Sequence, residues 1–146
     1  MNDIKLMNKA ADNIRILAAS MVEKAKSGHP GGAMGGADFV NVLFSEFLVY
    51  DPKNPAWEGR DRYFQDPGHM SPMLYSVLAL AGKFTIDELK EFRQWGSVTP
   101  GHPEVNVMRG IENTSGPLGQ GHTYAVGAAI AAKFLKARLG LSLIHI

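Results

Sequence analysis

Four of the five histidines in this 146-residue chain directly follow a glycine, and these pairs are the residues best suited to chemistry. An imidazole has a pKa of about 6.5, so it can donate, accept or shuttle a proton at neutral pH. Glycine permits backbone conformations that other residues avoid and lets another group approach closely. The repeated pairs therefore predict one polar site assembled from separate turns. The four histidines are His29, His69, His102 and His122.

Histidines in loops are often surface residues, and this alternative stays open for part of the set. His145 fits a surface residue best, and His122 fits equally well a residue that caps or lines the last helix. The glycine and proline surroundings recur at His29, His69 and His102, so coincidence is less attractive for these three. Spacing alone still leaves a shared site and coincidence both open.

A second candidate site is the glycine-rich segment at 116–121, which reads Gly-Pro-Leu-Gly-Gln-Gly and runs into a predicted helix. Free backbone N–H groups at the start of a helix can hold an anion such as phosphate. The segment has neither the Gly-Lys-Ser/Thr of a Walker loop nor the spacing of the dinucleotide fingerprint. A tight turn is therefore the favoured explanation, and a small phosphate-binding module is the alternative.

The composition excludes several kinds of site and partner. The chain has no cysteine, which excludes disulfides, zinc–thiolate sites and iron–sulfur clusters within it. Its 15 basic and 14 acidic residues give a formal charge of +1, which argues against nucleic-acid or membrane-surface partners. No recognisable metal-binding motif is present, so we expect no metal ligands in the chain. The N-terminus has no signal-peptide core and no apolar run approaches the ~20 residues of a bilayer span, so we expect a cytosolic protein.

The elements that position these residues are predicted to be mainly helices. Apolar residues recur at helical spacing, and capping signals and glycines mark where helices begin and end. A capping box at 85–88 opens a short polar helix. The predicted helices span 9–26, 37–48, 72–81, 85–94 and 122–139.

Four local features refine this prediction. Asn8 is expected to cap the first helix, and Ser71 the third. The segment 27–36 holds five glycines in ten positions, so it is predicted not to be helical, because each glycine costs about 1 kcal/mol relative to alanine. The residues at 37–48 are apolar on nearly all sides, which predicts a buried helix. Residues 62–64 are predicted to form a short strand.

Four motifs together resemble the start of transketolase. They occur in the family's order and at similar spacings, and the resemblance covers residues 8–140, which we expect to be part of the family's thiamine diphosphate-binding domain. The tail at 141–146 does not resemble the family. The motifs read SGHPGG at 27–32, DRYFQDPGHMSPMLY at 61–75, TPGHPE at 99–104 and TSGPLGQG at 114–121.

The resemblance implies an α/β fold, in which helices surround a parallel sheet that binds the cofactor diphosphate. This chain would be the mainly helical N-terminal part of that fold. The implied activity is the transfer of a two-carbon ketol unit from a ketose phosphate to an aldose phosphate, with thiamine diphosphate as cofactor and within the pentose phosphate pathway. Related ketol-transferring enzymes such as dihydroxyacetone synthase fit the same motifs. The family also implies a homodimer.

The resemblance also implies roles for individual residues. His29 would face the substrate and assist proton transfer, and His102 would bond the hydroxyl and carbonyl end of the donor sugar. His69 resembles the histidine near the cofactor diphosphate.

The segment of Gly116, Pro117 and Leu118 resembles the one that lies against the aminopyrimidine and thiazolium of the cofactor. The backbone of Gly116 would accept a hydrogen bond from the exocyclic amine, and Leu118 would help to hold the bent cofactor.

The chain departs from the family pattern in two places and lacks later parts of it. Asp66-Pro67 stands where many relatives carry small polar residues, and His122-Thr123-Tyr124 replaces an apolar segment that contains Asn. The family's Gly-Asp-Gly and later Asn, which hold Mg²⁺, are absent, as is the second domain, which comes from the dimer partner. We therefore expect the chain alone to be a non-catalytic fragment, unless a separate polypeptide completes it, and to expose apolar helix faces.

Overall fold

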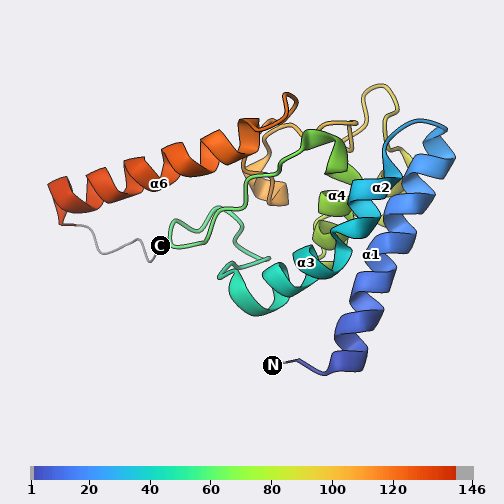
Figure 1. The fold of residues 1–146 in the computed structure, drawn as a ribbon, viewed down its shortest axis with the longest axis horizontal. Helices are drawn as coiled ribbons and strands as arrows, with labels where there is room; N and C mark the ends of the chain where they lie inside the picture. Colours follow the sequence, from blue (N-terminus) through green and yellow to red (C-terminus); the bar gives the residue numbers. More distant parts are fainter. Residues whose placement is uncertain (1, 141–146) are drawn as a thin grey trace.

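The computed structural model describes residues 2–140, and within this range the chain is helical with no β-strand. Helices α1 to α5 pack into one body, and α6 projects away from it (Figure 1). The expected tail at 141–146, with His145, lies outside the described residues. The helices are α1 (Ile4–Ala25), α2 (Pro30–Gly35), α3 (Ala37–Val42), the π-helical η1 (Leu43–Phe47), the 3₁₀-helical η2 (Gly68–Met70), α4 (Ser71–Leu80), α5 (Ile86–Lys90), the 3₁₀-helical η3 (Val107–Arg109) and α6 (Gln120–Leu139).

Helix α1 begins earlier than its apolar stripe predicts. The side chain of Asp3 accepts a hydrogen bond from the N–H of Leu6 at 3.0 Å and so caps the helix. The prediction of Asn8 as the cap is wrong, because Asn8 lies inside the helix. The buried face of α1 packs on α2, α3 and α4. It consists of Ala11, Ile14, Ala18 and Met21.

Helix α2 forms despite its three glycines, so the prediction that 27–36 is not helical is wrong. Close packing explains the difference. A Cβ atom on Gly32 would lie 2.9 Å from the Met70 side chain, and one on Gly36 would lie 2.6 Å from the sulfur of Met73. Close packing against the methionine side chains of η2 and α4 thus favours small residues here, and these tertiary contacts offset the low helix propensity of glycine.

Helix α4 lies at the centre of the core. Eight of its ten residues are buried, from Ser71 to Leu78. The ring of Tyr75 is fully buried and lies 5.4 Å from the ring of Phe84 and 6.3 Å from that of Phe92, between centroids. These aromatic contacts join α4 to the residues on either side of α5.

Two side chains of α4 hold the turn that carries His102. The hydroxyl of Tyr75 donates to the carbonyl of Pro100 at 2.8 Å, and the hydroxyl of Ser71 donates to the carbonyl of Gly101 at 2.7 Å. The prediction that Ser71 caps its own helix is therefore wrong, since its hydroxyl reaches across to another segment. The core helix fixes the backbone next to His102.

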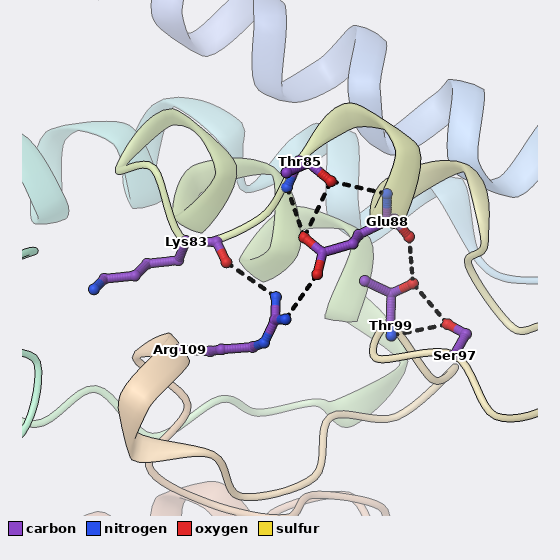
Figure 2. A network of polar contacts seen from close by, with 6 residues as sticks. All are labelled: Lys83, Thr85, Glu88, Ser97, Thr99 and Arg109. Atoms are coloured by element: carbon purple, nitrogen blue, oxygen red, sulfur yellow. Dashed lines mark hydrogen bonds and ion pairs between the residues drawn. The ribbon is translucent and has the colours of Figure 1, made fainter.

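Helix α5 opens with the predicted capping box, formed by Thr85 and Glu88. Figure 2 shows that Glu88 also joins two other segments. Its carboxylate accepts from Arg109 at 2.7 Å, and its backbone carbonyl accepts from the hydroxyl of Thr99 at 2.9 Å. The helix ends at Lys90, earlier than predicted, and turns follow it up to the segment of Thr99.

Glu88→Gln is expected to remove an acid-sensitive part of the stability. The hydrogen bond from Arg109, followed by that from the backbone of Thr85, lowers the pKa of Glu88 from 4.5 to about 2. A carboxyl whose pKa is lowered by folding stabilises the protein above its unfolded pKa, and this stability is lost as the pH falls towards its folded pKa. Because the pair is partly exposed, we expect a loss of about 1 kcal/mol at pH 7.

Thermal unfolding of the wild-type chain and the variant between pH 7 and pH 3 measures this effect. The difference in Tm should be present at pH 7 and should shrink below pH 4.5. A difference that stays constant down to pH 3 would contradict the role given to the Glu88 carboxylate. Glu58→Gln, whose side chain is 84% exposed, is the matched control.

The segment at 62–64 forms no strand, so that prediction is wrong. A strand needs a neighbour for its backbone hydrogen bonds, and the described residues offer none there. The segment is instead held by side chains. The ring of Tyr63 lies 5.4 Å from that of Phe44, between centroids.

Apolar side chains are exposed on α3, η1 and α6. Phe39 and Phe47 point out from the region predicted as a buried helix, so that prediction is only partly right. Helix α6 has one buried residue in the described structure, Gly121. A helix that is apolar on all sides is typical of the core of a larger unit. The exposed apolar residues of α6 are Tyr124, Val126, Ile130, Phe134, Leu135 and Leu139.

Candidate functional site

The structure brings the turns of His29, His69 and His102 together. The rings of His29 and His69 lie 4.7 Å apart between centroids, with their planes tilted by 49°. The ring of His102 packs against Gly68, where a Cβ atom would lie 2.9 Å from Cδ2 of the imidazole. His29 and His102 are exposed and His69 is half-buried, so the cluster is open to a ligand.

Three different elements hold these histidines in place. His29 is the residue immediately before α2, and His69 lies in η2. His102 follows the turn that α4 holds through its hydrogen bonds. The packing of α2 against η2 and α4 therefore determines how far apart the rings lie.

The electrostatics of the cluster favour a neutral His102. Desolvation of its ring lowers the pKa of His102, and the electrostatic effect of the nearby Arg93, His69 and His29 lowers it further. A neutral imidazole keeps one ring nitrogen free to accept a proton or a hydrogen bond at neutral pH. The cluster is thus suited to proton transfer.

Arg93 is a part of this site that the sequence analysis missed. Its guanidinium donates to the hydroxyl of Ser27 at 2.8 Å and lies against Gly101, where a Cβ atom would come 2.9 Å from Nη2. It thus joins the turn before His29 to the turn before His102. No local signal marks it, because it follows a short polar helix and belongs to no glycine–histidine pair.

The Gly116-Pro117-Leu118 segment starts beside the histidine cluster. A Cβ atom on Gly68 would lie 2.6 Å from the carbonyl oxygen of Ser115, so the His69 turn rests directly on the residue before the segment. All three residues of the segment are exposed, and Leu118 is 75% exposed.

Ser115 carries an unpaired polar atom at this position. Its hydroxyl is buried, and it has no hydrogen-bond partner among residues 2–140. Buried polar groups are nearly always paired, so each exception calls for an explanation. The unpaired hydroxyl of Ser115 directly precedes the exposed Gly116-Pro117-Leu118 segment, which is where a bound ligand could lie.

His122 is not part of the cluster. It lies in the first turn of α6, its side chain is 79% exposed, and its Nδ1 lies in close contact with the carboxylate of Asp66. Within residues 2–140 no three histidine or acidic side chains form a group that could hold a metal ion. None of the helices in this range is both long and apolar enough to cross a membrane.

Comparison with known proteins identifies the family. Residues 6–143 match the family model described as "Transketolase, thiamine diphosphate binding domain". The chain belongs to the transketolase family. The fold class expected from the sequence, the mainly helical N-terminal part of that family's cofactor-binding fold, is confirmed.

Individual transketolases show the same similarity. The chain is 52% identical to chloroplastic transketolase-1 of Arabidopsis thaliana over 93% of its length. It superposes on the transketolase crystal structure from Campylobacter jejuni with a TM-score of 0.86 and 48% identity, over 92% of the chain. It superposes on the transketolase of Pichia stipitis in complex with sedoheptulose 7-phosphate with a TM-score of 0.81 and 45% identity, over 86% of the chain.

The chain spans about a fifth of the length of these transketolases. It covers 19% of the Arabidopsis protein, 21% of the Campylobacter chain and 18% of the Pichia chain. The part that matches includes all three clustered histidines and the Gly116-Pro117-Leu118 segment.

Proposed function

We propose that this chain supplies the N-terminal part of the thiamine diphosphate site of a transketolase. The enzyme transfers a two-carbon ketol unit from a ketose phosphate to an aldose phosphate in the pentose phosphate pathway. The observation that carries the proposal is the convergence of three imidazoles beside an exposed glycine-rich segment. The Pichia relative is crystallised with sedoheptulose 7-phosphate, a ketose phosphate, which supports the substrate class.

The residues present fit the chemistry of the cofactor. Imidazole N–H groups suit an anionic diphosphate, and His69 is the residue proposed to bind it. The exposed Leu118 offers an apolar surface to a heteroaromatic ring, next to Pro117. Gly116 has no atom within 4 Å of an added Cβ position, so a ring can approach its backbone closely. When bound, thiamine diphosphate supplies the electron sink for cleavage of the donor's carbon–carbon bond.

The two other histidines are proposed to act on the sugar. His102, whose pKa is lowered, bonds the hydroxyl and carbonyl end of the donor and can accept a proton there. His29, exposed beside His69, faces the substrate and assists proton transfer. Fixing both rings on packed elements keeps the donor oriented for the reaction.

Several features of the complete enzyme extend beyond this chain and stay predictions. Mg²⁺ is predicted to bind together with the diphosphate, on ligands in the remainder of the domain. A homodimer is predicted, in which the partner subunit completes the site. The cytosolic location is a prediction from the sequence, and the relatives include an enzyme named as chloroplastic.

His102→Ala is the variant that tests the proposed reaction. It is made in a transketolase-length chain, by which we mean residues 1–140 of this sequence continued by the remainder of a transketolase. Loss of a positioned acid–base group typically slows turnover by about 10²–10⁴-fold, and we expect kcat for the donor ketose phosphate to fall within this range. Unchanged donor turnover would contradict the role of His102.

The 146-residue chain alone is expected not to bind thiamine diphosphate at micromolar concentration. It supplies only one side of the proposed site, and α6 exposes its apolar surface. Calorimetric titration with thiamine diphosphate and Mg²⁺, and separately with inorganic phosphate, distinguishes the alternatives. Micromolar, metal-dependent cofactor binding would show that the chain is competent by itself. Binding of phosphate alone would favour the small phosphate-binding module.

A further inference from the structure

We propose that Asp66 is a positioning residue for the Gly116-Pro117-Leu118 segment, and that it acts together with His122. The inference rests on the proposed function, because it concerns the same cofactor site. It goes beyond the residue roles that the resemblance implies, because neither Asp66 nor His122 is among the residues given such a role.

The carboxylate of Asp66 is almost enclosed, with its side chain 6% exposed. It accepts hydrogen bonds from the N–H of Gly119, at 3.1 Å to Oδ1 and 3.2 Å to Oδ2, and it pairs with Nδ1 of His122. A buried carboxylate is stable only when its charge is met by donors or by an opposite charge. The donor N–H of Gly119 and the ring of His122 lie one and four positions after the segment.

Backbone packing reinforces the contact. A Cβ atom on Gly121 would lie 2.5 Å from Cβ of Asp66 and 2.5 Å from the carbonyl oxygen of Gln65. Gly121 is also the one residue of α6 that the described structure buries. The first turn of α6 thus packs against Gln65 and Asp66. The rest of the helix extends away from the other helices (Figure 1).

The extended backbone just before Asp66 is held by hydrogen bonds between Gln65 and Asn113. Gln65 is fully buried, and its N–H donates to the side chain of Asn113 at 2.9 Å while the amide of Asn113 donates back to its carbonyl at 3.3 Å. The residue next to Asp66 in the chain is therefore fixed by a buried pair of hydrogen bonds.

The segment is consequently held at both ends by residues that flank one turn. At its start, the carbonyl of Ser115 rests on Gly68. At its end, Gly119 is bonded to Asp66. Both Asp66 and Gly68 lie within three residues of His69, so the distance between His69 and the three exposed residues is set by these two contacts.

His122 completes the arrangement from α6. Asp66 and His122 are therefore one unit, made of an acidic residue on the His69 turn and a histidine on the helix that follows the segment. Loss of either residue should let the segment shift relative to His69. The expected consequence is weaker binding of thiamine diphosphate.

The test is a double-mutant cycle in the transketolase-length chain. Asp66→Asn, His122→Ala and the double variant are titrated calorimetrically with thiamine diphosphate in the presence of Mg²⁺. We expect Asp66→Asn to raise Kd by about tenfold, His122→Ala to raise it by about threefold, and the double variant to be no weaker than Asp66→Asn, because residues that act as a unit are not additive. His122→Asn, whose amide nitrogen can replace Nδ1, should restore much of the affinity.

A control variant and the measured Kd values decide whether Asp66 positions the segment. Lys53→Ala, at an exposed position in the segment that follows η1, is the control and should bind as the wild type does. Kd values unchanged in both single variants, or effects that simply add, would overturn the role of Asp66 while leaving the proposed function intact. Failure of the wild type to bind thiamine diphosphate would overturn both. If Asp66→Asn does not fold, the exposed His122 variants carry the test, and equal Kd values for Ala, Asn and wild type at that position would overturn it.

Discussion

Gly68→Ala should disrupt the histidine cluster and weaken thiamine diphosphate binding in the transketolase-length chain by about 100-fold or more. The added Cβ atom would lie 2.6 Å from the carbonyl oxygen of Ser115 and 2.9 Å from Cδ2 of His102. The first of these neighbours is backbone, so it cannot turn aside as a flexible side chain can. The turn of His69 must therefore move away from the Gly116-Pro117-Leu118 segment. Forcing an extra methyl group into a packed site also costs about 1–3 kcal/mol of stability.

Calorimetry with thiamine diphosphate and Mg²⁺ measures the first effect, and thermal unfolding measures the second. Gly35→Ala is the matched control. It lies in α2 with nothing within 4 Å of an added Cβ, so it should leave binding unchanged and stabilise the helix by up to about 1 kcal/mol. Wild-type affinity in Gly68→Ala would show that the contact between the two segments does not matter for binding.

Tyr75→Ala should lower the free energy of unfolding by about 3–5 kcal/mol, the cost typical of removing a large buried aromatic side chain. Tyr75 is fully buried against Phe84 and Phe92, so its loss leaves a cavity at the centre of the core. Burial and the charge of Glu104 raise the pKa of its phenol, which therefore stays protonated and keeps donating to Pro100.

Urea unfolding of the 146-residue chain measures this loss, and Tyr75→Phe separates its two causes. The Phe variant keeps the ring but leaves the carbonyl of Pro100 without its donor, for an expected loss of about 1–3 kcal/mol. Tyr124→Ala, on the exposed surface of α6, is the control and should change stability by less than about 0.5 kcal/mol. Equal stability of Tyr75→Ala and wild type would contradict the central place of α4.

Local sequence signals predicted most of the helices. They did not predict features that depend on tertiary packing, such as helix α2 and the absence of a strand at 62–64. The capping box of Thr85 and Glu88 correctly predicted the start of α5. The glycines of α2 were misleading, because Gly32 packs closely against the side chain of Met70 and does not form a turn. Residues 62–64 have the composition of a strand, but a strand also needs a neighbour, and sequence periodicity does not reveal one.

The candidate site shows the same division. The repeated glycine–histidine pairs suggested that His29, His69 and His102 share a site, and their rings do lie together. Arg93 could not be found in this way, since its contacts with the site come from residues distant in the sequence. The Asp66–His122 pair is likewise invisible in the sequence, where 55 positions separate two residues that each look like an isolated substitution.

The apolar surfaces of α3 and α6 also have a simple physical explanation. The composition of residues 37–48 predicted a buried helix, and exposed apolar helix faces were expected for this chain by itself. Phe39, Phe47 and Ile130 are exposed in the described structure. The matched transketolases are about five times longer, and we expect their additional chain to cover such faces.

A crystal structure of the transketolase-length chain with thiamine diphosphate and Mg²⁺ would show whether the three histidines and Leu118 line the cofactor site. We expect the cofactor to contact His69 and Leu118, and its reactive ring to face His29 and His102. A cofactor bound elsewhere, with the three imidazoles in contact with neither the cofactor nor the donor sugar, would show that the proposed site is wrong.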